Sequence, residues 1–192
     1  MIDRYFDPEA FDAELMALPG EFAPPNGRLL LAQEGEIAAG CAALHDLGDG
    51  ACEMKRMFVH TEFHGKGVGR ILAECVISEA KAIGYKVMRL DTGARQREAQ
   101  ELYRKFGFKP IEAYYDLPDD CGNGSCLWNW TWRFKRSVYL YPRLSDLNGV
   151  VGVQSFGVHD AGERSNARIL RSQIAVAAML IGATRCHNAV KP

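Results

Sequence analysis

The sequence has no apolar run long enough to cross a bilayer: the longest, 174–181, falls far short of the roughly 20 residues needed. It opens with Met1-Ile-Asp-Arg4, without an apolar targeting segment. Its six cysteines form no Cys-x-x-Cys pair and have no histidine at zinc-ligand spacing. We therefore expect a reduced, cytoplasmic protein without a membrane partner and without a metal ion.

A strong excess of one charge is also lacking. Over the whole chain 23 Lys and Arg stand against 24 Asp and Glu, which gives no electrostatic signal for nucleic acid. The two parts differ, because residues 1–134 carry 15 basic against 21 acidic residues and residues 135–192 carry 8 against 3. At 192 residues, 47% of them hydrophobic, we expect one domain over 1–134 and an atypical carboxyl-terminal extension over 135–192.

The most informative segment is 53–70, Glu-Met-Lys-Arg-Met-Phe-Val-His-Thr-Glu-Phe-His-Gly-Lys-Gly-Val-Gly-Arg. It joins a short apolar strand, a glycine-rich turn and the start of a helix. Glycines at 65, 67 and 69 allow the backbone to approach a ligand closely, and the first amides of a helix lack partners within it. This arrangement suits a pyrophosphate. The spacing fits neither the lysine-ended P-loop nor the dinucleotide fingerprint.

Apolar periodicity and turn residues predict the order of the secondary structure. A short helix over 8–16 precedes the main run, and 166–183 is also helix-like. The predicted strands are 28–33, 37–47, 51–60, 86–92 and 108–115, and the predicted helices between them are 68–83 and 96–106. Alternation along the third strand predicts that Glu53, Lys55, Met57 and Val59 share one of its faces.

The order of Glu53, Met57-Phe-Val59, His64-x-x-Gly67-x-Gly69 and Leu102-Tyr-Arg-Lys-Phe-Gly-Phe108 resembles the GNAT family of N-acetyltransferases over roughly residues 28–115. The family writes its loop Gln/Arg-x-x-Gly-x-Gly/Ala, so both glycines match and His64 departs. The resemblance implies an α/β (α+β) fold, with a mixed central sheet and helices on both faces.

The first strand and first helix of the family have no counterpart in this sequence. Either the start at Met1 lies too late in the gene or an edge strand is absent. If it is absent, we expect the strand at 28–33 to be an exposed sheet edge, which could pair with a second chain in a homodimer.

The resemblance further implies acetyl-CoA as the cosubstrate and direct transfer of the acetyl group to a primary amine of a small molecule or peptide. The implied cosubstrate-binding residues are Met57, Phe58, Val59, His64, Gly65, Lys66, Gly67, Val68, Gly69, Arg70 and Gln96. The first three would act through their main chain. Gln96 stands where relatives often have an asparagine that contacts the pantetheine arm.

Two residues match catalytic positions of the family. Glu53 would collect the proton of the amine, helped if burial raises its pKa, and Tyr103 would protonate the departing thiolate. Each also has an ordinary structural interpretation: Glu53 could form an ion pair with Lys55 or Arg56, and the ring of Tyr103 could pack its helix onto the sheet.

The alternative function is that of a non-catalytic acyl-CoA-binding protein, or degenerate acetyltransferase homologue, which keeps the glycine turn but lacks a working acceptor site. If the chain is an enzyme, the acidic character of residues 1–134 mildly favours a cationic or small amine over an acidic one.

All three tryptophans lie at alternate positions in 128–132, where the family has its closing strand. Tryptophan has one codon and asparagine two, so the underlying bases are nearly fixed. Read from the third base of the Leu127 codon, they give Leu/Met/Val, Glu, Leu, Asp and Leu/Met/Val, which resembles the family's closing strand. We therefore hypothesise a slip of the reading frame near 125–127. The period of two also makes the segment a plausible strand as it stands.

Overall fold

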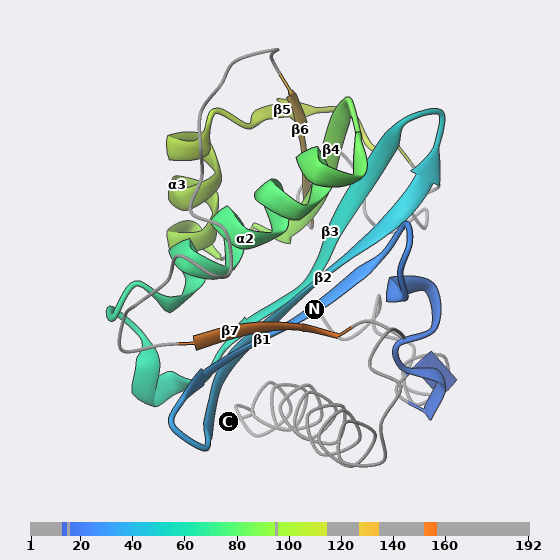
Figure 1. Cartoon of the computed structure of the whole chain (residues 1–192). Coiled ribbons are helices and arrows are strands. Elements are labelled where there is room, and N and C mark those ends of the chain that lie inside the picture. Colours follow the sequence, from blue (N-terminus) through green and yellow to red (C-terminus); the bar gives the residue numbers. More distant parts are fainter. Residues whose placement is uncertain (1–12, 15, 95, 115–126, 135–151, 157–192) are drawn as a thin grey trace.

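The computed structural model describes residues 13–14, 16–94, 96–114, 127–134 and 152–156. Within these residues seven strands form one sheet in the order β5-β6-β4-β3-β2-β1-β7 (Figure 1). The strands are β1 (Arg28–Glu34), β2 (Ile37–Gly48), β3 (Ala51–Val59), β4 (Val87–Gly93), β5 (Lys109–Ile111), β6 (Leu127–Arg133) and β7 (Gly152–Phe156). The helices are α2 (Val68–Ile83) and α3 (Arg97–Phe106), and η1 (Gly20–Phe22) and η2 (Thr61–Phe63) are short 3-10 turns.

The sheet is mixed, as predicted. Strands β1, β2 and β3 form an antiparallel meander, β3 and β4 are parallel, and β6 runs antiparallel between β4 and β5. Helices α2 and α3 both pack on one face, called here the helix face. The opposite face, called here the outer face, is partly covered by η1 and the turn before it. The predicted α/β (α+β) class is confirmed.

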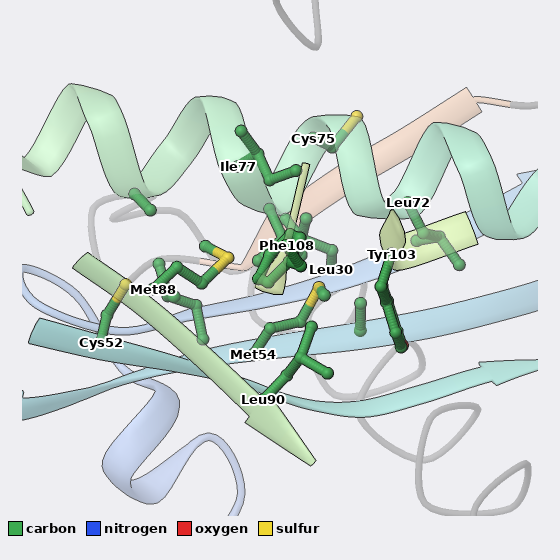
Figure 2. Packing of buried hydrophobic residues seen from close by; sticks show 14 of the residues in the cluster. Leu30, Cys52, Met54, Leu72, Cys75, Ile77, Met88, Leu90, Tyr103 and Phe108 are labelled. Carbon is green, nitrogen blue, oxygen red and sulfur yellow. The ribbon is translucent and has the colours of Figure 1, made fainter. Parts of the chain in front are cut away.

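Helix α2 occupies the predicted range because its ends carry strong signals. Gly67 and Gly84 cap it with left-handed backbone, and the amide of Gly84 donates to the carbonyls of Ala80 and Lys81. Its apolar side chains, among them Leu72 and Ile77, point into the main core cluster above the sheet (Figure 2). The helix is therefore fixed along its whole length by buried contacts.

Most predicted elements agree with the structure to within one residue at each end. The exception is the strand predicted over 108–115, because only Lys109–Ile111 pairs with β6. Pro110 in its centre has no amide hydrogen to donate, which favours a short edge strand. Of the helix predicted over 8–16, residues 13, 14 and 16 are helical, while its other residues and the helix-like segment 166–183 lie outside the described residues.

The tryptophan-rich segment forms the predicted strand β6. Trp130 is completely buried in the main core cluster, and the ring of Trp132 lies 5.7 Å from that of Phe108 and 4.9 Å from that of Phe134. A fully buried tryptophan side chain contributes a large apolar area to the core. The segment therefore serves as a central strand, and the slip of the reading frame stays a prediction about the gene.

The expectation that β1 is an exposed edge is wrong. Strand β7, from the carboxyl-terminal extension, pairs antiparallel with β1 from Leu29↔Phe156 to Gln33↔Gly152. Since β2 occupies the other side of β1, both of its edges are used within the chain. The homodimer therefore loses its structural argument and stays a prediction only.

We expect a chain that ends at residue 151 to self-associate more strongly than one that ends at residue 157. The shorter chain lacks β7 and leaves the β1 edge unpaired, whereas the longer chain keeps that strand. Sedimentation velocity over a concentration series compares the two. Identical sedimentation would contradict the assignment of β7 as the strand that protects β1.

Candidate active site

The candidate site lies where β3 and β4 stop pairing. Their parallel ladder contains only three residue pairs and ends at Glu53↔Arg89. Beyond this point β3 continues beside β2 and β4 continues beside β6. The ladder therefore does not use the backbone groups on the facing edges of the two strands, and such groups need other partners.

A bulge in β3 changes which side chains face each side of the sheet. Arg56 has a φ of 54°, and the register with β2 shifts between Cys41 and Ala43. As a result, Met57 and Val59 pack against the core on the helix face. Glu53 lies on the outer face, since its neighbours in the chain, at 52 and 54, belong to that core. The predicted shared face of all these residues is therefore wrong.

The glycine loop, residues 64–70, connects η2 to α2 and is open where an anion would approach. Gly65 and Gly67 have φ values of 75° and 83°, and an added Cβ at either would meet no atom within 4 Å. The side chain of Val68 is buried, so only its main chain is available to a ligand. Within the described part of the chain, the amides of Val68, Gly69 and Arg70 donate to no acceptor. The loop therefore fits the predicted anion site.

The side chains of the glycine loop differ in their availability to a ligand. His64 Nε2 lies 3.0 Å from the carbonyl oxygen of Val59 and so ties the loop to the end of β3. Arg70 Nε donates to Glu74 at 2.9 Å, and Lys66 Nζ lies 4.7 Å from the centroid of the Phe63 ring. Lys66 is therefore better placed than Arg70 to meet a phosphate.

Gln96 holds the turn between β4 and α3. Its Oε1 accepts hydrogen bonds from Thr92 Oγ1 at 2.7 Å and from the Gly93 amide at 3.1 Å. The side-chain oxygen is thus occupied within the chain, which leaves the amide nitrogen as the group that could contact a pantetheine arm.

Glu53 is buried, with 6% of its surface exposed, and both of its oxygens are hydrogen-bonded. His45 Nε2 lies 2.6 Å from Oε2, the hydroxyl of Tyr114 donates to Oε1, and Lys55 Nζ lies 3.9 Å away. Burial raises the pKa of this carboxyl, but the hydrogen bonds of His45 and Tyr114 and the charge of Lys55 lower it more. The condition that burial raises the pKa of Glu53 is therefore not met.

The contacts of Glu53 continue toward solvent through His45. His45 Nδ1 lies 3.1 Å from Oε2 of Glu21, whose side chain is 45% exposed. Sequence reasoning missed His45, although the turn at Asp49-Gly50 brings it opposite Glu53 in the β2/β3 register. No comparable sequence signal exists for Glu21 or Tyr114, because each reaches the carboxylate network from outside the meander.

Tyr103 belongs to the core on the helix face, and 4% of its surface is exposed. Its ring lies 5.8 Å from that of Phe108, which confirms the packing role. Burial, with a smaller effect of the charge on Asp91, raises the pKa of its hydroxyl above the ordinary value. The hydroxyl therefore stays protonated at neutral pH, as a proton donor must, and the acid role stays a prediction.

Among the described residues, no group of three or more His, Cys, Asp or Glu side chains could hold a metal ion. No helix in this part of the chain has the length and apolar character needed to span a membrane.

Comparison with known proteins gives a family match over more than half of the chain. The profile of the acetyltransferase (GNAT) family matches residues 2–108. The range includes β3, the glycine loop and all of α3, and it ends before β5 and β6.

Curated relatives match between about two fifths and just over half of the chain. An uncharacterized N-acetyltransferase of Schizosaccharomyces pombe is 40% identical over 109 residues, which cover 56% of this chain and 67% of that protein. An IAA acetyltransferase of Azospirillum brasilense is 40% identical over 45% of this chain and 57% of its own length. An N-acetylaspartate synthetase of Danio rerio is 32% identical over 41% of this chain and 28% of its own length. The chain thus spans about two thirds or less of these relatives.

Solved structures share the fold. A GNAT acetyltransferase of Staphylococcus aureus superposes with a TM-score of 0.58 at 19% identity, covering 70% of this chain and 84% of that one. A GNAT family acetyltransferase of Elizabethkingia anophelis with acetyl-CoA bound superposes with a TM-score of 0.53 at 25% identity, covering 67% and 84%.

The lowered pKa of Glu53 predicts how its contribution to stability depends on pH. Because the folded-state pKa lies below the ordinary value of 4.5, ionised Glu53 stabilises the folded state fully above that pH. The contribution is lost as the pH falls through the lower, folded-state value. The free energy of unfolding should therefore differ most between wild type and Glu53→Gln near neutral pH, and the difference should shrink below pH 4.5.

Urea unfolding between about pH 3 and pH 7 measures this difference. Glu36→Gln, at an exposed turn position, is the matched control and should show little change at any pH. A difference for Glu53→Gln that stays constant down to the lowest pH would contradict the lowered pKa.

Proposed function

Because the chain belongs to the acetyltransferase (GNAT) family, we propose that it transfers the acetyl group of acetyl-CoA directly to a primary amine of a small molecule or peptide. One observation carries the proposal: the unpaired amides at the start of α2 follow directly on the strand that stops pairing with β4. An anion site and an unused strand edge are thereby joined in one continuous segment.

The residues on both sides of this junction fit acetyl-CoA. The amides of 68–70, the positive end of α2 and Lys66 would hold the pyrophosphate. The facing backbone edge of Met57, Phe58 and Val59 would hold the pantetheine arm, and an amide there aimed at the thioester oxygen would stabilise the developing negative charge. The bound cosubstrate supplies an acetyl group already activated as a thioester. The acetyl-CoA complex of the Elizabethkingia relative supports this choice of cosubstrate.

Glu53 would receive the proton that the amine loses. Its lowered pKa makes it a weaker base than expected but keeps it ionised, so its contribution depends on its position near the end of the β3/β4 ladder. His45 and Tyr114 fix the orientation of the carboxylate and act as positioning residues. Tyr103 would return a proton to the departing sulfur.

The relatives carry names of different specificity, since one is an IAA acetyltransferase and another an N-acetylaspartate synthetase. The family therefore leaves the acceptor open. The alternative function, acyl-CoA binding without catalysis, is favoured by one observation: both oxygens of Glu53 already have partners.

We expect Gly67→Glu to weaken acetyl-CoA binding about 100-fold, because the new carboxylate would face the pyrophosphate. Gly48→Glu is a matched control: the two glycines have φ values of 83° and 80°, and an added Cβ meets nothing within 4 Å at either. Calorimetric titration with acetyl-CoA compares the variants after their fold has been checked by circular dichroism. Equal affinity of both variants would place the cosubstrate elsewhere.

We expect Glu53→Gln to lower kcat about 100-fold at neutral pH, since the amide cannot accept the proton, while the affinity for acetyl-CoA is unchanged. Release of free thiol across a panel of primary amines measures the rate, with Glu36→Gln as the control. A wild-type chain that binds acetyl-CoA but acetylates no amine would instead support the non-catalytic function.

A further inference from the structure

The part of the molecule that the proposed chemistry leaves unexplained is Arg89, the β4 residue that pairs with Glu53. Met88 and Leu90 on either side of it are buried under the helices, so the side chain of Arg89 lies on the outer face, as does that of Glu53. It is half-buried. Arginine in the middle of a central strand therefore needs a partner for its charge.

The described residues supply no such anionic partner. The guanidinium of Arg89 lies 5.1 Å from the centroid of the Tyr114 ring, its one recorded interaction. Glu53 is adjacent in register, but its carboxylate is held by His45 and Tyr114 and makes no ion pair with Arg89. The five donors of the guanidinium thus remain available beside the proposed base.

Cationic side chains also lie beside Glu53 in the same row of the sheet. One row of residues crosses the outer face from β2 to β5: His45, Glu53, Arg89, Thr131 and Lys109. The row contains two cationic side chains, Arg89 and Lys109, on the side of Glu53 toward β5, and Lys55 lies on the same face. Lys55 already faces the carboxylates of Glu53 and Glu21, so Arg89 and Lys109 are the cations of this face that a bound carboxylate could meet.

We propose that Arg89 binds a carboxylate of the acceptor, so that the substrate class is free amino acids. Neighbouring strands are about 4.8 Å apart, so a base on β3 and a guanidinium on β4 can meet the amine and the carboxylate of one small molecule. Arginine binds a carboxylate with two parallel hydrogen bonds. These bonds neutralise the charge of the carboxylate and also fix the orientation of the substrate, and therefore the position of its amine. In that case the charge of the acceptor is selected by Arg89 and not by the overall acidity of residues 1–134.

This inference rests on the proposed function, and its test separates the two. The full-length protein is assayed with acetyl-CoA and with pairs of acceptors that differ only in the carboxylate, each amino acid beside its amide. Wild type should prefer the amino acid by about 100-fold in kcat/KM. In Arg89→Gln, kcat/KM should fall about 100-fold for the amino acids and change by less than about threefold for the amides. Arg89→Lys, which keeps the charge but not the fork, should fall between them.

Lys86→Gln, an exposed basic position just before β4, is the matched control and should leave the preference unchanged. If Arg89 only supports the ring of Tyr114, Arg89→Gln will reduce the rates for amino acids and amides equally, which would overturn the inference. Equal kcat/KM of the wild-type enzyme for amino acids and for their amides would overturn the inference too, while leaving the acetyltransferase function intact.

If the protein shows no measurable turnover, a binding measurement tests the inference instead. Binding of each amino acid and its amide to the CoA-saturated protein is measured by calorimetry for wild type and Arg89→Gln. Amino-acid binding that depends on Arg89 supports the inference, and equal or absent binding of both ligands overturns it. If the folded wild type binds neither CoA nor acetyl-CoA, the proposed function fails first and the inference falls with it.

Discussion

The organisation of this protein depends on the short length of the hydrogen-bonded ladder between β3 and β4. After Glu53 and Arg89 each strand follows a different neighbour, and two backbone edges are left facing each other without a ladder. Such edges are stable only when another polar group or water satisfies them. The bulge at Arg56 lies on this unpaired part of β3 and directs Met57 and Val59 into the core, so the main chain is what remains for a ligand. The glycine loop follows within a few residues.

The separation of the strands requires support from the far end of the chain. Because β4 shares only three residue pairs with β3, its longer ladder with β6 holds it in place, and Trp130 anchors β6 in the core. On the opposite side, β7 closes the edge at β1. Both supporting strands come from sequence beyond the range that matches the family profile. The geometry of the site is thus coupled to a segment whose sequence is atypical of the family.

Most of the fold could be predicted from local patterns, namely the apolar periodicity and the turn residues of the sequence. Helix α2 was predictable to the residue, since its apolar period is bounded by glycines that take left-handed conformations. The glycine loop and Glu53 were found because motif and resemblance agreed. The pairing of β7 with β1 joins residues about 120 positions apart, and no local signal fixes such a contact. The bulge was missed because Arg56 adopts a positive φ that glycine or asparagine usually marks. The lowered pKa of Glu53 depends on Tyr114 and His45, whose approach only the folded chain defines.

Hydrogen–deuterium exchange with and without saturating acetyl-CoA tests the central claim most directly, because the amides of 68–70 are unpaired in the described chain and exchange quickly when nothing covers them, and because β3 over 57–59 has a ladder only on its β2 side. The account predicts that acetyl-CoA slows exchange at 68–70 and along 57–59, while β1 and β2 keep their rates. If saturating acetyl-CoA slows exchange only in other segments, or leaves the rates at 68–70 and at 57–59 unchanged, a site built on the separation of β3 and β4 is contradicted.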